Sequence, residues 1–171
     1  QHWKTTGMKD TLDIEYVGLV KAFVREYERE NLQALQRLPG DSGYDYVICG
    51  NALAEAFTHG KVEKADVHLL GFNKKEPVEG QLELEDKLDR LGFKKTNLSE
   101  SDKFFAGWSH PQNPTIFIFT TYKTRQELLN EFKIKHLKSL SYYKGTLYIS
   151  SYAYDCVMNK KFTVSSVGHG D

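Results

Sequence analysis

Apolar residues near the start of the chain recur every three or four positions, and this spacing predicts one long amphipathic helix over 11–38. Asp10 or Thr11 is expected to cap the start of this helix, and Pro39-Gly40 is expected to end it. The charged residues between the apolar ones predict a face in contact with solvent. The apolar stripe consists of Leu12, Tyr16, Leu19, Val20, Phe23, Val24, Tyr27, Leu35 and Leu38.

The middle of the chain alternates between short apolar runs and helix-like segments. The run at 46–49 is continuously apolar, which is typical of a strand buried on both faces. Pro77 is expected in the first turn of a helix that closes at Gly92. The elements expected here are a strand over 46–49, a helix over 51–58, a strand over 65–72 and a helix over 77–92, whose apolar residues are Val78, Leu82, Leu88 and Leu91.

The last third of the chain predicts a hairpin followed by a helix, a strand and a final helix. Thr124 and Glu127 have the spacing of a capping box, and Ser150 or Ser151 can cap the final helix. The expected elements are strands over 103–108 and 115–122, a helix over 124–132, a strand over 145–149 and a helix from about 151 to 160. The whole pattern predicts one α/β domain over 1–171, with a mixed sheet of about five strands covered by helices and a tail over 163–171.

The composition agrees with an ordinary globular domain of 171 residues, which is long enough to bury a core. The 23 basic and 23 acidic residues cancel, which argues against a whole face that grips nucleic acid by charge. No apolar run approaches the ~20 residues that a membrane-spanning helix needs. Since the sequence starts at Gln1 and shows no signal-like segment, we expect a mature secreted form or a trimmed chain, and leave both alternatives open. We expect a cytoplasmic location, with secretion as the alternative.

The two cysteines, Cys49 and Cys156, are too few for a disulfide framework, and neither belongs to a CxxC pair. We therefore expect two buried free thiols. One bridge between them is the alternative if the protein is secreted.

Two short motifs carry the candidate chemistry. Gly50-Asn51 follows a strand and begins a helix, whose free N–H groups and dipole attract phosphate. Asp66 and His68 lie two positions apart on the next strand, so their side chains share one face and can hold a divalent ion. Each motif taken singly also has a purely structural explanation. Gly50-Asn51 can be an ordinary strand-to-helix turn, and Asp66 and His68 can be a partly exposed acid and a histidine with a local hydrogen bond.

Taken together, the motifs resemble the nucleotidyltransferase superfamily of DNA polymerase beta type, and most of all its small stand-alone members. In that family a strand leads through a glycine turn into a short helix, and a strand with two acids follows. Gly50-Asn51 occupies the turn here, and Asp66-Val67-His68 occupies the acidic pair. The segments 88–93 (LDRLGF) and 146–162 resemble later parts of the family, with Lys160 or Lys161 as its closing lysine. The resemblance covers about 44–162 and implies a triphosphate at the turn and Mg²⁺ or Mn²⁺ at Asp66 and His68.

The chain departs from the family where its acids should be. The second acid is His68, and the strand over 115–121, which should carry a third, contains neither Asp nor Glu. Nucleotidyl transfer by two metal ions needs carboxylates, and Mg²⁺ tolerates imidazole poorly. We therefore expect a degraded metal site, unless Asp102 or Asp155 supplies a carboxylate from elsewhere in the fold.

Three functions stay open from the sequence. The favoured one is a protein of this fold that binds a partner or a nucleotide without efficient catalysis. The second is an active divergent nucleotidyltransferase that modifies a protein, an RNA or a small molecule, and the third is an unrelated secreted interaction module. The segment 133–144 mixes lysines with His136, Tyr142 and Tyr143, a composition that can bind single-stranded nucleic acid.

Overall fold

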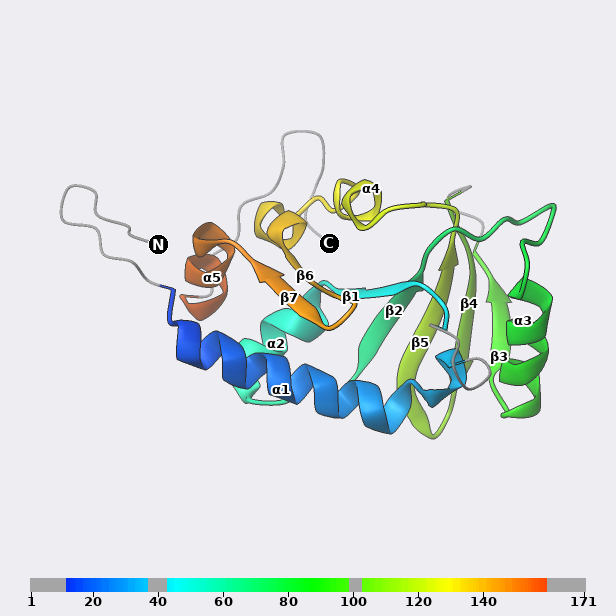
Figure 1. Ribbon diagram of the computed structural model, residues 1–171, viewed down its shortest axis with the longest axis horizontal. Coiled ribbons are helices and arrows are strands. Elements are labelled where there is room, and N and C mark those ends of the chain that lie inside the picture. The colour runs from blue at the N-terminus through cyan, green and yellow to red at the C-terminus, as the bar shows by residue number, and fades with distance from the viewer. Residues whose placement is uncertain (1–11, 37–42, 99–102, 160–171) are drawn as a thin grey trace.

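Seven strands form one mixed sheet in the order β3-β4-β5-β2-β1-β6-β7 (Figure 1). The structure, a computed structural model, describes residues 12–36, 43–98 and 103–159. β2 and β5 run parallel, and every other neighbouring pair is antiparallel. The strands are β1 (Tyr46–Cys49), β2 (Ala65–Leu69), β3 (Lys94–Asn97), β4 (Phe104–His110), β5 (Asn113–Thr120), β6 (Leu140–Tyr143) and β7 (Thr146–Ile149).

The helices divide between the two faces of this sheet. α1 crosses the strands as the longest of them, and it contacts α2, which in turn contacts α5 (Figure 1). No helix among the described residues is both long and apolar enough to cross a bilayer. The helices are α1 (Ile14–Asn31), α2 (Asn51–His59), α3 (Gln81–Arg90), α4 (Arg125–Leu129) and α5 (Ser151–Met158), with short 3₁₀ turns η1 (Gln33–Leu35) and η2 (Lys135–Ser139).

The alternation of side chains along the strands separates two clusters of apolar residues. Ile48, Val67 and Phe117 point to the face that packs against Val24 of α1 and Phe57 of α2. The opposite face is covered only in part. There Val47, Cys49 and Leu70 pack against Tyr122 and against Leu128 and Leu129 of α4. The rest of this second face stays open, and the candidate site lies there.

Local sequence signals fix several of the predicted elements. The Asp13 carboxylate accepts a hydrogen bond from the Tyr16 N–H and caps α1, two residues after Thr11 and three after Asp10, the two predicted caps. Thr124 and Glu127 form the predicted capping box at the start of α4. The Ser150 hydroxyl accepts from the Ala153 N–H at the start of α5. The prediction of an α/β domain with a mixed sheet is confirmed.

The predicted helix after Pro77 was wrong in its start and in its buried face. α3 begins at Gln81, and the side chains of Leu82 and Leu91 are 65% and 51% exposed. Gln81 is buried instead, because its side-chain oxygen accepts from the N–H groups of Asn73 and Val78 and fixes the preceding loop. A polar side chain that bonds the backbone thus takes the place where an apolar one was expected.

The strand count was also too low, because β3 and β6 were not predicted. β3 consists of exposed polar residues at the edge of the sheet and lacks any apolar alternation. β6 lies in the segment 133–144, for which the sequence predicted no strand. Its pairing with β1 and β7 nevertheless buries Tyr142 completely.

Candidate functional site

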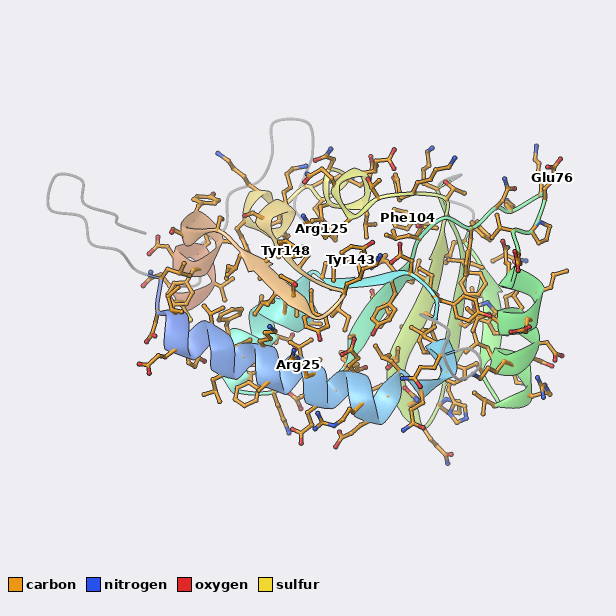
Figure 2. All side chains as sticks on the ribbon, viewed as in Figure 1. Arg25, Glu76, Phe104, Arg125, Tyr143 and Tyr148 are labelled. Atoms are coloured by element: carbon orange, nitrogen blue, oxygen red, sulfur yellow. The ribbon has the colours of Figure 1, made fainter. Side chains whose placement is uncertain are left out.

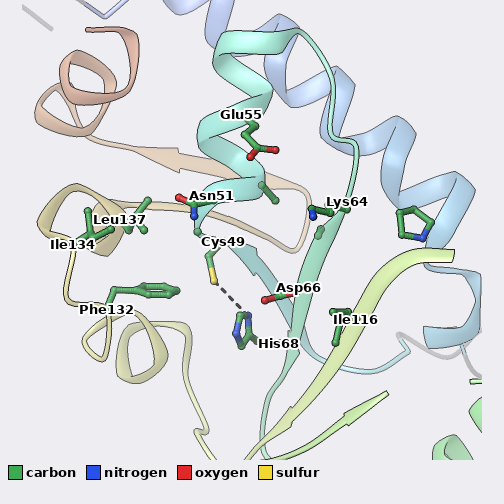
Figure 3. A pocket seen from close by; sticks show the side chains of 14 residues that line it. Cys49, Asn51, Glu55, Lys64, Asp66, His68, Ile116, Phe132, Ile134 and Leu137 are labelled. Carbon is green, nitrogen blue, oxygen red and sulfur yellow. Dashed lines mark hydrogen bonds between the residues drawn. The ribbon is translucent and has the colours of Figure 1, made fainter. Parts of the chain in front are cut away.

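The open face of the sheet holds a cavity of about 430 Å³ between the start of α2, β2 and the segment that follows α4 (Figure 3). Its floor is formed by β2 and by the neighbouring end of β5. The predicted residues Gly50, Asn51, Asp66 and His68 all line this one cavity. Its wall opposite β2 is apolar and consists of Phe132, Ile134 and Leu137.

The start of α2 lies on the cavity without any side chain to cap it. Gly50 has φ 79° and ψ −151°, a conformation open almost only to glycine, and it turns the chain from β1 into the helix. No side chain bonds the first amides of α2, whereas the Gly50 carbonyl already accepts from Leu53 and Ala54. The N–H groups at Asn51 and Ala52 therefore remain available to an anion, which the helix dipole also favours.

The side chains of Asp66 and His68 reach the cavity from alternate positions of β2. Asp66 pairs with Ile116 of β5, and His68 pairs with Ile118. Each place beside these side chains on β5 is therefore occupied by an isoleucine. Lys64 lies two residues before Asp66 and lines the same cavity (Figure 3).

Burial sets the protonation of the three titratable groups at the floor. It lowers the pKa of His68 to about 4, so the imidazole is neutral at pH 7. Burial also raises the pKa of the Cys49 thiol, whose sulfur lies 3.6 Å from His68 Nδ1. Partial burial raises the pKa of Asp66, and the charge of Lys64 opposes this shift. Cys49 and His68 thus form a neutral pair and cannot act as an activated thiolate with an imidazolium.

The floor of the cavity does not fit a pair of Mg²⁺ ions. Asp66 is the one carboxylate of the floor, and His68 already contacts Cys49 through Nδ1. Within the described ranges no three side chains of His, Cys, Asp or Glu converge to hold an ion. Asp155 does not replace the missing acid, because it lies on α5 and accepts a hydrogen bond from Asn159. Asp102 and the predicted Lys160 lie outside the described residues.

Several lining residues escaped the sequence reasoning. Glu55 lies one helical turn after Asn51, and Lys64 has the same spacing of two from Asp66 that links Asp66 to His68. Either spacing could have shown from the sequence that the side chain shares a face with a predicted site residue. No local signal marks Phe132 and Ile134, because the fold alone brings the segment after α4 to the cavity.

The two cysteines agree with the sequence prediction. Cys49 and Cys156 are both buried and both free. The described chain therefore gains no stability from a bridge between them.

Comparison with known proteins adds a distant similarity. No protein-family model and no curated protein sequence matches the chain. Among solved structures, the apo form of a CCA-adding enzyme aligns over 90% of this chain and 34% of its own length, at 12% sequence identity and a TM-score of 0.46. The chain thus spans about a third of that enzyme. At this identity and score the match shows nothing about the chemistry of this chain, and the chemistry of the cavity is inferred from its own residues.

Proposed function

We propose that the chain binds a nucleotide in the cavity between α2 and β2 and does not transfer nucleotidyl groups efficiently. One observation carries this proposal: the uncapped start of α2 opens into the same cavity as Asp66 and Lys64. Together they supply backbone donors and a cation for phosphates, with a carboxylate beside them.

The phosphate end of the nucleotide is assigned to the polar side of the cavity. The N–H groups at Asn51 and Ala52 would donate to phosphate oxygens, and Lys64 would neutralise part of their charge. Asp66 and Glu55 are acids in the same cavity and would repel a bare triphosphate. A nucleotide that brings its own Mg²⁺ avoids this repulsion, since Mg²⁺ binds through one or two carboxylates together with phosphate oxygens.

The base end of the nucleotide is assigned to the apolar wall. Phe132 supplies an aromatic ring, and Ile134 and Leu137 extend the surface around it. A flat base gains contact area on such a wall, and the cavity volume of about 430 Å³ suits a ligand of nucleotide size.

We expect no efficient nucleotidyl transfer, because the described residues of the cavity lack the carboxylates that the reaction needs. In a two-metal reaction the ions stabilise both the attacking and the leaving oxygen, and they need carboxylates to hold them. Ile116 and Ile118 stand beside Asp66 and His68 and offer no oxygen. Loss of a single preorganised charge-stabilising group often costs about 10²–10³ in rate, so the missing acids should leave little turnover.

Isothermal titration of the full chain with ATP, GTP, CTP and UTP, with and without Mg²⁺, tests the proposal. We expect Mg²⁺-dependent binding of at least one nucleotide, weakened about tenfold or more in Lys64→Gln because a charge-assisted contact is lost. Lys61→Gln is the matched control, since Lys61 is an exposed lysine of the same loop and does not line the cavity. Asp66→Asn should abolish the Mg²⁺ dependence.

Two results would contradict the proposal in different ways. Heat changes no larger than those of dilution for all four nucleotides would reject nucleotide binding. Release of pyrophosphate that requires Mg²⁺ and disappears in Asp66→Asn would instead show an active nucleotidyltransferase.

A further inference from the structure

Three tyrosines of β6, β7 and α5 carry cationic side chains on their rings. The Arg125 guanidinium lies 3.9 Å from the centre of the Tyr148 ring. The Lys144 ammonium lies 5.3 Å from the ring of Tyr143, and the Lys135 ammonium lies 5.4 Å from the ring of Tyr152. We call these three pairs the aromatic strip. Tyr148 and Tyr152 are 39% and 40% exposed, which is high for aromatic side chains.

Sheet register places two pairs of the strip on the same face as the cavity. Cys49 pairs with Ser141 and Ser141 pairs with Tyr148, and paired residues of neighbouring strands point to one side. Tyr143 lies two residues after Ser141 and therefore points to this side as well. Figure 2 shows Arg125, Tyr148 and Tyr143 gathered around the β6–β7 hairpin.

Hydrogen bonds hold the strip in place across several elements. Arg125 donates from Nη1 to the Ser141 hydroxyl at 3.0 Å, which ties α4 to β6 beneath the guanidinium. The Ser139 and Ser150 hydroxyls lie 2.7 Å apart and join η2, which carries Lys135, to the cap of α5, which carries Tyr152. The Arg125 guanidinium and the elements that carry the strip are thus held in place, which lowers the entropy lost when a ligand binds.

The structure keeps part of the basic segment seen in the sequence and adds residues from other elements. His136 and Tyr142, which belong to the segment 133–144, are buried and cannot contact a partner. The Lys138 ammonium donates a hydrogen bond to the Asn130 carbonyl at 2.7 Å. The strip contains Lys135, Tyr143 and Lys144 of the segment. Its other members are Tyr148 of β7, Tyr152 of α5 and Arg125 of α4.

We infer that the aromatic strip binds single-stranded nucleic acid. Exposed rings provide stacking surfaces for bases, and a guanidinium plane stacked on a tyrosine extends such a surface. The lysine ammonium groups are free to turn from the rings to phosphates, whose charge they complement. The Lys144 end should contribute least, because Asp45 lies 4.0 Å from that ammonium and accepts a hydrogen bond from the Tyr143 hydroxyl.

Fluorescence anisotropy with a labelled oligouridine of about 12 nucleotides tests this inference on the full chain. We expect Tyr148→Ala and Tyr152→Ala each to weaken binding about fivefold or more, because a stacked base is lost. Tyr148→Phe should retain the affinity, since it keeps the ring. Lys75→Gln, an exposed lysine in the loop after β2, is the control for charge alone.

The salt dependence gives a second readout that a purely structural role would not change. Two phosphate contacts, from Lys135 and Lys144, predict a slope of about −1.4 for log K against log salt, and Lys135→Gln should make it less negative by about 0.7. Absence of any anisotropy change, or equal losses in Lys75→Gln and Lys135→Gln, would overturn the inference. Equal affinity for an oligoglutamate of the same length would also overturn it and indicate an acidic peptide as the partner. Asp66→Asn should bind the oligouridine as the wild type does, which separates this surface from the nucleotide cavity.

Discussion

Acidification should destabilise this protein through His68, and replacing His68 with leucine should remove that effect. The imidazole is 8% exposed and packs against the Phe104 ring, with 5.8 Å between the ring centres. Burial lowers its pKa from 6.5 to about 4, so between these pH values the unfolded chain binds a proton that the folded chain does not. The free energy of unfolding therefore carries no penalty from His68 above pH 6.5, and it decreases as the pH falls from 6.5 towards 4.

The magnitude follows from the interval between the two pKa values. It spans about 2.5 pH units, and each unit is worth about 1.4 kcal/mol, so the full loss is about 3 kcal/mol. Between pH 7 and pH 5 the loss should be about 2 kcal/mol. For a domain with a total stability of roughly 5–15 kcal/mol this is a large fraction.

Urea titrations of wild type and His68→Leu at pH 7 and pH 5 measure the effect. The wild type should lose about 2 kcal/mol more than the variant between the two conditions, whatever the other ionisable groups contribute to both. Identical losses in wild type and His68→Leu would refute the assignment of a buried neutral imidazole.

Four further outcomes are expected. Gly50→Ala should destabilise the fold by about 1–3 kcal/mol in urea titrations through its backbone conformation, since no atom lies within 4 Å of an added Cβ. Gly18→Ala in α1 has the same free space but helical geometry and should stabilise by about 0.5–1 kcal/mol, so equal effects at the two sites would contradict this reasoning. Asp66→Asn should raise the urea midpoint of unfolding at pH 7, because burial raises the pKa of Asp66 and so disfavours its charged form in the folded state. This gain in stability should fade as the pH falls below the raised pKa, where the folded protein already holds Asp66 protonated. A variant less stable than the wild type at pH 7 would contradict this expectation. Cys49 should react with iodoacetamide only when the chain unfolds, since burial keeps its thiol neutral, and mass spectrometry showing rapid native labelling at this residue would contradict that expectation.

Sequence reasoning succeeded where the local signal was strong. The continuous apolar run of β1 and the glycine at each end of α2 predicted those two elements to within a residue. The spacing of Asp66 and His68 predicted that both side chains face one way, and both line the cavity that also receives Gly50. Such signals depend on neighbours close in sequence, which are the only ones that local propensity can report.

Reasoning from the sequence failed where distant residues decide the outcome. β3 has no apolar pattern and exists because β4 offers it an edge to pair with. Gln81 is buried because a loop eight residues away supplies partners for its amide. Phe132 reaches the cavity because α4 folds over the second face of the sheet.

By itself the sequence determined the class of fold, the strand-to-helix turn at Gly50 and the absence of acids from the strand over 115–121, since each of these follows from residue type and short-range spacing. Tertiary structure alone decided that Lys64 and Phe132 complete a cavity, and that the exposed tyrosines of the hairpin and α5 meet cations from α4 and η2. It also decided the protonation of His68, because burial lowers the pKa and burial depends on what the rest of the chain packs around the ring. Contacts between segments far apart in the chain are set by the packing of the whole domain, which no local pattern encodes.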